Sequence, residues 1–538
     1  MIPFLTLVPF LMTVDVQSIR QDVVYLASDA LAGRATGSAG NNLAAAYLSK
    51  RFEAVGLMPG VGSLPHRSWL QPFTVAMGNK PTAQCQVTIR GQKRSFGKML
   101  MVHPRSGPGV VSADLVLATP GRSVTGKIAV TPLPEDAGLI KQAGIVATLR
   151  DAGAIGVIFT SPVTPDGHFG IHVDGPGSDY GLPVIVMAAS ELTDLRDAST
   201  PAKITVTMEK VDVVTHNVVA VLPGTDPKLA REVVVVGAHM DHLGLGGASS
   251  LSDSKRPAIH HGADDNASGA SALIEIASIL SSPVNRPKRT IVFIAFSGEE
   301  LGLLGSVHYV KNPVFPIADT VAMINLDMVG RLRDKSRLSI IGVKTSPGWH
   351  ALVSPLVKST ALNVVLEDST SGGSDHQPFQ NAKVPVNFFF TGLHSDYHRP
   401  SDTSDKIDFA GIASVSQLAA RLVERVGDRT ERLAFSEVSV ASGGSGTMRA
   451  KASLGTIPEY GAGVVGVLLG GVRPGSPAEK AGLLAGDIMV SFAGKTIRSI
   501  EEYTAILSEC NPGDVVIIKV SRKGTIFTMS ATLVESRR

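Results

Sequence analysis

The stretch 232-EVVVVGAHMDHLG-244 sets the fold, because an uninterrupted apolar run ends there on histidine and aspartate side chains. A strand with one solvent-exposed face alternates apolar and polar residues. This run does not alternate, so we expect both of its faces to be covered. Four further runs have the same texture: 290-TIVFIAF-296, 320-TVAMINLD-327, 337-RLSIIGV-343 and 385-PVNFFFT-391. The sequence therefore predicts a largely parallel sheet that is buried on both sides.

Amphipathic segments separate these runs. Both 268-SGASALIEIASILSS-282 and 414-SVSQLAARLVERV-426 carry apolar residues at helical spacing. Strands that alternate with helices predict an α/β fold, a mixed and mostly parallel sheet flanked by helices, over residues 212–435. We assign residues 18–80, with the helical pattern 41-NNLAAAYLSKRFEAVGL-57, to the same domain.

Polar side chains gather where the predicted strands end. In open α/β sheets, ligand sites form where the carboxyl ends of parallel strands meet, so residues distant in sequence are expected to converge there. The acidic and histidine residues at these positions are His239, Asp241, Asp264, Asp265, Glu299, Glu300, Asp327 and His398.

This combination of side chains is typical of a metal site. The chain has only two cysteines, Cys85 and Cys510, which excludes a disulfide framework and a cysteine-rich zinc site. Zinc accepts imidazole and carboxylate ligands together. A carboxylate that spans two ions holds them about 3.5–4 Å apart, and a bound water then has a pKa near about 7. A further carboxylate that is not a ligand must accept the proton of that water.

Bulk composition narrows the class of protein. The 538 residues are 44% hydrophobic and 18% charged, which is typical of a globular chain of roughly three domains. A net charge of +3 gives no reason to expect nucleic acid or an anionic membrane as a partner.

The N-terminus carries an apolar run over residues 2–12, which is too short to span a bilayer. It resembles the core of a secretory signal, although a basic leader and a clear cleavage site are missing. We interpret residues 1–17 as the remnant of an atypical or truncated signal segment. We therefore expect no integral membrane span and an extracytoplasmic location, periplasmic or secreted. An ordinary buried segment is the alternative.

The strand-end motifs resemble those of the zinc exopeptidases of peptidase family M28. Members combine an HxD after a strand, a DN- or DD-type turn before a helix, a GEE or AEE pair, an LD strand end and a late histidine. All five occur in this order between His239 and His398. The segments 26-LASDALAGR-34 and 397-YHRPSDT-403 also resemble family members. The resemblance implies an aminopeptidase that acts on peptides with two zinc ions; manganese and cobalt remain alternatives.

The resemblance also implies a role for each motif residue. His239 and Asp327 would bind one ion, Glu300 and His398 the other, and Asp265 would bridge the two. The family pattern favours Asp265 over Asp264 as the bridge, because the bridging residue directly precedes an asparagine.

Two more residues complete the implied machinery. Glu299 would be the general base and acid, and Asp241 would orient His239 from behind the metal. Each residue taken alone has an ordinary explanation, such as a buried core histidine or a helix N-cap. We interpret the remaining histidines of these loops as pocket lining or surface: His242, His260, His261, His376 and His394. The predicted substrate pocket comprises Ser374, Asp375, His376 and Tyr397.

Two flanking modules are predicted as well. Residues 81–211 resemble a protease-associated domain, most clearly in 152-AGAIGVIFTSP-162, and we expect a β-rich insert there. A Ser/Gly-rich linker over residues 436–447 precedes a unit over residues 448–538, whose segment 472-VRPGSPAEKAGLLAGD-487 resembles bacterial PDZ domains. Such domains bind a peptide C-terminus as an added strand. The carboxylate loop would comprise Leu454, Gly455, Thr456 and Ile457.

The sequence leaves several functions open. Selectivity for the amino end of a peptide depends on the resemblance alone, so a carboxypeptidase or a dipeptidase with the same metal site is the nearest alternative. A glutaminyl-cyclase-like acyltransferase usually works with one metal, which the full ligand set argues against. A non-catalytic receptor or scaffold would be expected to lack ligands that this chain retains.

Overall fold

A computed structural model describes residues 14–535, except residues 64, 96–99, 104, 134–138, 163–178, 193–198, 247–248, 253–256, 333–336, 369–372, 438–450, 459–463, 474 and 499. The chain divides into two compact units. The first comprises Met1–Phe73, Val214–Ser252 and Pro257–Val440, and the second comprises Thr74–Val213, Asp253–Arg256 and Ala441–Arg538. The apolar run at residues 2–12 and most of the predicted linker lie outside the described residues.

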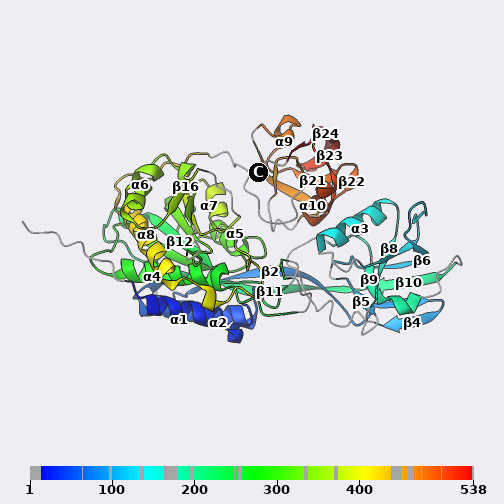
Figure 1. The fold of residues 1–538 in the computed structure, drawn as a ribbon, viewed down its shortest axis with the longest axis horizontal. Coiled ribbons are helices and arrows are strands. Elements are labelled where there is room, and N and C mark those ends of the chain that lie inside the picture. Colours follow the sequence, from blue (N-terminus) through cyan, green and yellow to red (C-terminus); the bar gives the residue numbers. More distant parts are fainter. Residues whose placement is uncertain are drawn as a thin grey trace, which may run out of the picture. The chain divides into compact units, whose positions relative to one another are not determined.

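A nine-stranded mixed sheet forms the centre of the first unit (Figure 1). Its four central strands are all parallel to one another, whereas the strand that flanks them on each side runs antiparallel to these four. The order across the sheet is β1 (Met58–Pro59), β11 (Met208–Leu222), β13 (Thr290–Phe296), β12 (Val233–His239), β14 (Thr320–Leu326), β17 (Val386–Phe390), β15 (Leu338–Ile341) and β16 (Val364–Glu367), with β2 (Leu70–Pro81) paired to β11. The predicted mixed, mostly parallel sheet is confirmed.

Helices cover both faces of this sheet, which explains the uninterrupted apolar runs. Val234 and Val236 of β12 join the cluster that faces α1 (Val16–Leu26), α2 (Ala39–Ala54), α4 (Gly269–Ser281) and α8 (Phe409–Asp428). Val233 and Val235 belong to a separate cluster with residues of α5 (Leu304–Lys311) and α7 (His376–Asn381). Successive side chains of a strand point to opposite faces, so every position of β12 is buried.

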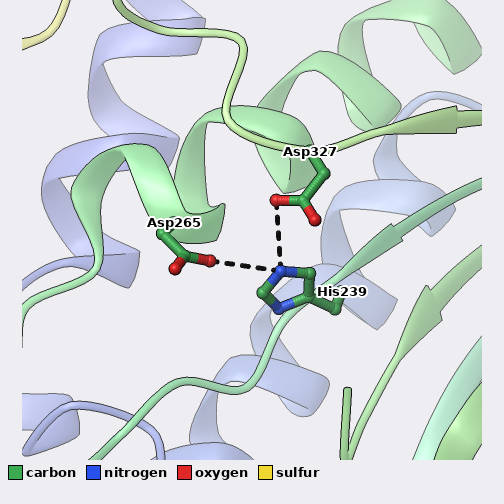
Figure 2. A group of neighbouring side chains, drawn as sticks. All are labelled: His239, Asp265 and Asp327. Carbon is green, nitrogen blue, oxygen red and sulfur yellow. Dashed lines mark hydrogen bonds and ion pairs between the residues drawn. The ribbon is translucent and has the colours of Figure 1, made fainter. Parts of the chain in front are cut away.

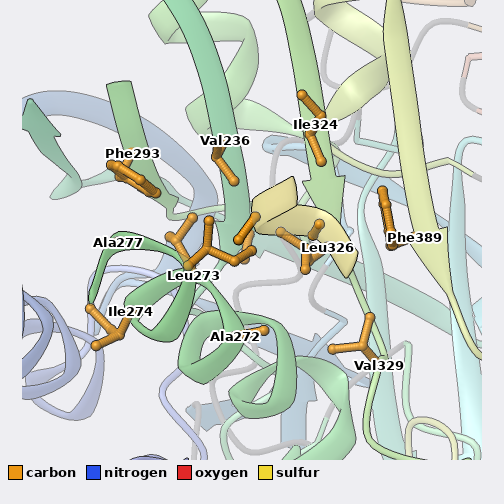
Figure 3. Close-up of a cluster of buried hydrophobic side chains, with 14 of the residues drawn as sticks. Val236, Ala272, Leu273, Ile274, Ala277, Phe293, Ile324, Leu326, Val329 and Phe389 are labelled. Atoms are coloured by element: carbon orange, nitrogen blue, oxygen red, sulfur yellow. The ribbon is translucent and has the colours of Figure 1, made fainter. Parts of the chain in front are cut away.

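Helix α4 is the central helix of the first face. It contacts α8, which lies beside it (Figure 1), and its side chains pack against one face of the central strands (Figure 3). Leu273 and Ala277 face Val236 and Ile324 in this cluster, and all four are fully buried. The predicted helices at residues 268–282 and 414–426 are therefore confirmed as α4 and α8.

The second unit contains the predicted β-rich insert. Its eight-stranded sheet has the order β4 (Gln92–Ser95), β3 (Gln86–Ile89), β10 (Pro201–Val206), β6 (Gly109–Leu117), β7 (Ile128–Pro132), β8 (Gly156–Ser161), β9 (Val184–Ala188) and β5 (Leu100–Val102). Helix α3 (Leu139–Asp151) precedes β8. The assignment of this insert to the protease-associated domains stays a prediction.

The C-terminal part of the second unit is a smaller sheet with two helices. The order is β19 (Thr456–Pro458), β20 (Val467–Val472), β21 (Ile488–Phe492), β23 (Val515–Arg522) and β24 (Thr525–Thr532), with β22 (Lys495–Thr496) on β21. Helices α9 (Pro477–Lys480) and α10 (Ile500–Glu509) complete the fold. No helix among the described residues is long and apolar enough to cross a membrane.

The packing of α4 gives a stability prediction. Leu273→Ala should lower the free energy of unfolding of the first unit by about 2–5 kcal/mol, because a fully buried leucine leaves a cavity. Leu43→Ala is the matched control, since Leu43 on α2 is 46% exposed and its loss should cost less than about 0.5 kcal/mol. The two tryptophans, Trp69 and Trp349, both belong to the first unit, so denaturant unfolding followed by tryptophan fluorescence reports on it. Equal losses in the two variants would contradict this packing.

Candidate metal centre

The ends of the central strands bring ligand-type side chains to one edge of the sheet. His239 is the last residue of β12, and Asp327 directly follows β14. Glu299 and Glu300 follow β13 after a short turn that begins at Ser297. Because β12 pairs in parallel with both β13 and β14, these three strand ends lie next to one another.

Three residues make up a first group of potential ligands, drawn in Figure 2: His239, Asp265 and Asp327. The Nε2 atom of His239 lies 3.2 Å from Oδ1 of Asp265 and 3.3 Å from Oδ1 of Asp327. All three are buried, and each comes from a different segment of the chain. One imidazole and two carboxylates thus point at a common position.

The other oxygen of Asp265 faces a second imidazole. Nε2 of His398 lies 3.3 Å from Oδ2 of Asp265 and 3.2 Å from Oε2 of Glu300. The Nδ1 atom of His398 is held 2.9 Å from the carbonyl oxygen of Ser249. Asp265 therefore stands between two imidazoles, one on each of its oxygens, which is the arrangement that a bridging carboxylate requires.

His242 lies in this second group as well. Its Nδ1 atom is 2.6 Å from Oε1 of Glu300, and His242, Asp265 and Glu300 form a second set whose ligand atoms lie close together. From the sequence, we interpreted His242 only as pocket lining or surface. Its only signal was its position three residues after His239, in the same strand-end turn.

Asp241 has different contacts from those expected. The Nδ1 atom of His239 lies 3.1 Å from the main-chain oxygen of Asp241, whereas the nearest carboxylate oxygen of Asp241 is 4.0 Å away. The carboxylate instead accepts hydrogen bonds from Thr36 Oγ1 at 2.8 Å and from the amide of Glu299 at 3.2 Å. Asp241 thus orients His239 through its backbone and fixes the start of the Glu299–Glu300 turn through its side chain.

Asp264 points away from both imidazole groups. Its carboxylate accepts a hydrogen bond from the amide of Gly330 at 2.6 Å and lies 3.1 Å from Nε2 of His394. Asp265, and not Asp264, is therefore the aspartate in contact with His239 and His398.

The remaining loop histidines have partners of their own. His260 bonds to Ser250 and to the carbonyl of Ala258, and His261 bonds to Pro400 and Asp29. His242, His260 and His376 are all buried, so they are not surface residues, and pocket lining stays a prediction for them.

The four residues of the predicted substrate pocket divide into two sets. Ser374, Asp375 and His376 are fully buried, and the Ser374 hydroxyl donates to Oδ2 of Asp327 at 2.8 Å while accepting from Asn325. Tyr397 is part-exposed and stacks on His398, with ring centroids 3.8 Å apart. Their contact with a substrate stays a prediction.

The electrostatics of the two imidazoles reflect the surrounding carboxylates. Burial alone would lower the pKa of His239, but Asp327, Glu299 and a hydrogen bond with Asp265 raise it well above the usual range. Burial likewise opposes the effect of Glu300 and Asp265 on His398, yet the pKa of His398 also rises well above its usual value. The raised pKa values of both imidazoles thus reflect the negative charge of the carboxylates around them.

The two adjacent glutamates are shifted in opposite directions. Burial, only partly opposed by His239 and reinforced by Glu300, raises the pKa of Glu299 well above its usual range. For Glu300, burial is outweighed by His398 and His242, and its pKa falls to about 2. Glu300 is thus held as an anion, whereas Glu299 has a high affinity for a proton.

The donors fit a pair of divalent metal ions. Imidazole nitrogens and carboxylate oxygens are the ligands that zinc accepts in the absence of cysteine. The ligand-type atoms lie close together and are buried or nearly so, and a cation among them would compensate the negative charge of the carboxylates. The groups that could hold the ions are His239, Asp265, Asp327, Glu300, His398 and His242.

The predicted carboxylate loop of the C-terminal module lies at the edge of its sheet. Leu454 is fully buried, and Thr456 begins the edge strand β19, with its hydroxyl 2.9 Å from the Tyr503 hydroxyl of α10. Gly455 has a φ of +85°, and an added Cβ would lie 2.3 Å from the Ser476 side chain, so only glycine fits there. Ile457 pairs with Gly471 of β20.

Known protein families match two parts of the chain. Residues 217–423 match the model of peptidase family M28, and residues 470–522 match a PDZ domain model.

Several named proteins are similar to parts of this chain. Leupeptin-inactivating enzyme 1 of Streptomyces exfoliatus is 29% identical over 36% of this chain and 39% of its own length. Aminopeptidase YwaD of Bacillus subtilis is 33% identical over 30% of this chain and 37% of its own length. An aminopeptidase of Pseudomonas aeruginosa is 32% identical over 45% of this chain and 44% of its own length. The matched segments thus span less than half of these relatives.

Solved structures share the fold. A zinc aminopeptidase from Bacillus subtilis superposes with a TM-score of 0.52 at 22% identity, covering 78% of this chain and 96% of its own. An aminopeptidase from an Aneurinibacillus strain gives a TM-score of 0.51 at 23% identity, covering 79% and 97%. Over residues 217–423 this chain therefore matches peptidase family M28 in sequence, with the ordered motifs in the matched region, and over residues 470–522 it matches a PDZ domain.

Proposed function

We propose that this protein is a metal-dependent aminopeptidase that removes N-terminal residues from peptides with two zinc ions. The observation that carries the proposal is the position of Asp265, whose two oxygens lie 3.2 and 3.3 Å from the Nε2 atoms of two different imidazoles. A carboxylate placed in this way can join two cations. Manganese or cobalt could replace zinc with the same donor set.

In the proposed site, His239 and Asp327 would hold one ion, Glu300 and His398 would hold the other, and Asp265 would contribute one oxygen to each. The ions would polarise the scissile carbonyl and make hydroxide available near neutral pH. His242 is assigned a different task, because its Nδ1 atom contacts Oε1 of Glu300 and leaves Oε2 to face His398. It orients the Glu300 carboxylate.

Glu299 is the proposed proton carrier. Its carboxylate lies 4.0 Å from Nε2 of His239 and outside both ligand groups, and its environment raises its pKa. A carboxyl group of this kind accepts a proton from the attacking water and delivers it to the leaving amine. Its amide is fixed by Asp241, which keeps the side chain directed at the site.

Tyr397 is proposed to contact the substrate. Burial and the nearby carboxylates of Asp265 and Glu300 raise the pKa of its hydroxyl, so the phenol stays protonated. A protonated hydroxyl beside the metal ligands can donate a hydrogen bond to a substrate oxygen as negative charge develops there. Substrate contact through Ser374, Asp375 and His376 would require one of these buried side chains to become accessible.

The preference for amino ends is supported by similarity to proteins named aminopeptidases. Among the described side chains we find none that can be assigned to recognition of a free amine, so a carboxypeptidase or a dipeptidase is the competing function.

For the PDZ module we propose a peptide C-terminus as ligand, added to the edge strand β19. An extracytoplasmic location stays a prediction from the N-terminal sequence.

The substrate class is tested directly with the purified protein. We expect release of aniline from aminoacyl-anilides and of N-terminal residues from C-terminally blocked peptides, and no cleavage of N-terminally blocked peptides. Chelator should abolish both activities, and zinc should restore them. Cleavage of N-blocked substrates alone would contradict an aminopeptidase, and activity that persists in chelator would contradict a metal enzyme.

The roles of Glu299 and Asp265 separate by metal content. Glu299→Gln should keep both ions but lower kcat by about 10²–10⁴-fold, because it removes the proton carrier and spares the ligands. Asp265→Ala should deplete both ions, because it removes a donor from each group. Metal analysis beside steady-state kinetics measures both quantities. Equal metal loss in the two variants would show that the assigned roles are wrong.

His398 and His242 are a matched pair for the second ion. His398→Ala should reduce the bound metal from two ions to one per chain. His242→Ala should retain two ions at saturating zinc but weaken the second by about 10–100-fold, as expected for a residue that orients a ligand. Titration with a zinc-competing chelator resolves the two cases. Loss of one ion at saturating zinc in the His242 variant would make His242 the ligand instead.

A further inference from the structure

Asp402, in the segment 397-YHRPSDT-403, is a fully buried carboxylate that belongs to neither ligand group. Its contacts lie on the chain segment that carries Asp265. Oδ2 of Asp402 accepts hydrogen bonds from the amide of Asp264 at 2.8 Å and from the amide of Asp265 at 3.1 Å. Its main-chain oxygen accepts a third bond, from the amide of Ala263 at 3.1 Å. One residue thus binds three consecutive amides.

These bonds fix the direction in which Asp265 leaves the backbone. Hydrogen bonds from amides to a carboxylate are about twice as strong as those between neutral groups. The amide plane of Asp265 sets where its side chain begins, and two bonds to one oxygen restrain rotation of the Asp264–Asp265 segment. The reach of both Asp265 oxygens toward His239 and His398 therefore depends on this anchor.

The opposite side of the same segment is held by a cation. The guanidinium of Arg34, itself only 1% exposed, donates to the carbonyl of His261 at 2.7 Å and to the carbonyl of Gly262 at 3.1 Å. Carbonyls are thus fixed by Arg34 and amides by Asp402. The stretch that leads into Asp265 is bound from two sides.

A buried anion beside other carboxylates requires compensation, and Arg331 supplies it. Nη2 of Arg331 lies 2.8 Å from Oδ1 of Asp402 and 3.2 Å from Oδ2 of Asp396. The two oxygens of Asp402 therefore have separate tasks: Oδ1 pairs with the cation, and Oδ2 binds the amides. The Arg331 side chain is 12% exposed, so its replacement leaves a smaller defect than the loss of Asp402 itself.

We propose that Asp402, compensated by Arg331, is a positioning residue that holds Asp265 where it can bind two metal ions at once. This inference rests on the proposed two-metal function and assigns no contact with the substrate or the ions to Asp402. A merely structural tie would affect stability alone. A positioning role also changes the ligand field and the retention of the metals.

The test uses the full chain loaded with Co²⁺, whose visible absorption reports the geometry of its ligands. The variants are Asp402→Ala, Asp402→Asn and Arg331→Gln. Lys406→Gln is the matched control, because Lys406 pairs with Asp396 at 2.7 Å and has no bond to Asp402. Three quantities are measured: the Co²⁺ spectrum, the rate of metal loss to a chelator, and kcat and KM separately.

The expected results are graded. Asp402→Ala should alter the spectrum, speed metal loss by about 10–100-fold and lower kcat with little change in KM. Asp402→Asn should rescue part of this, because the amide oxygen can still accept both N–H groups while the charge is lost. Arg331→Gln should have a smaller effect of the same kind, and Lys406→Gln should match the wild type.

Each outcome decides the proposal. If the wild-type chain binds two Co²⁺ ions and the Asp402→Asn and Asp402→Ala variants keep its spectrum and its rate of metal loss, the positioning role is overturned while the proposed function stands. If the wild-type chain binds no Co²⁺, the proposed function fails and this inference fails with it. Should Asp402→Ala not fold, the Asp402→Asn and Arg331→Gln variants give the same decision.

Discussion

The crowding of buried carboxylates at one sheet edge is the constraint on which the rest of the site depends. Asp241, Glu299, Glu300 and Asp327 follow the ends of strands that are parallel neighbours, and Asp265 joins them from the segment that leads into α4. Like charges at such distances in a medium of low dielectric repel strongly. The arrangement is stable only when positive charge stands among the carboxylates, and imidazoles, one guanidinium and divalent cations are the available sources.

Among these sources of positive charge, Arg34 is the guanidinium. Its guanidinium donates to carbonyl oxygens of Leu26, Met240, His261 and Gly262 rather than to any carboxylate. Burial lowers its pKa to about 10, against the opposing pull of Asp265, Asp241, Asp402 and Glu300, so it remains a cation near neutral pH. It carries charge into the region while joining the loop of His239 to the loop of Asp265.

The backbone of Arg34 is itself unusual. Its φ of +52° is a left-handed conformation that a residue with a Cβ rarely adopts. Such a conformation persists where the surroundings over-determine it. Here the carbonyl of Arg34 accepts the amide of His242 at 3.2 Å, and the carbonyl of Gly33 accepts the amide of Gly244 at 2.9 Å. These two hydrogen bonds hold the segment 26-LASDALAGR-34 against the loop that follows β12, which gives a structural reason for the residues of this segment.

The sequence predicted what depends on periodicity and topology, and little of what depends on side-chain geometry. Uninterrupted apolar runs predicted β12, β13 and β14, and parallel pairing then required His239, Glu299 and Asp327 to share an edge. His242 contacts Glu300, which lies 58 positions away in the sequence. Asp402 accepts a hydrogen bond from the amide of Asp265, which lies 137 positions away. No periodic pattern encodes such a contact, because it depends on loop conformation and rotamer.

The clearest limit of sequence reasoning is the pair Glu299 and Glu300. The two residues are chemically identical neighbours, and yet their pKa values are pushed in opposite directions. Glu300 points between two imidazoles, which hold it as an anion suited to ligate a cation. Glu299 faces other carboxylates with one imidazole at 4.0 Å, and its pKa is raised. Where two neighbouring titratable groups have pKa values shifted apart by their environments, one can transfer protons while the other stays charged. The surrounding fold, and not the residue type, therefore assigns ligand and proton carrier within this dipeptide.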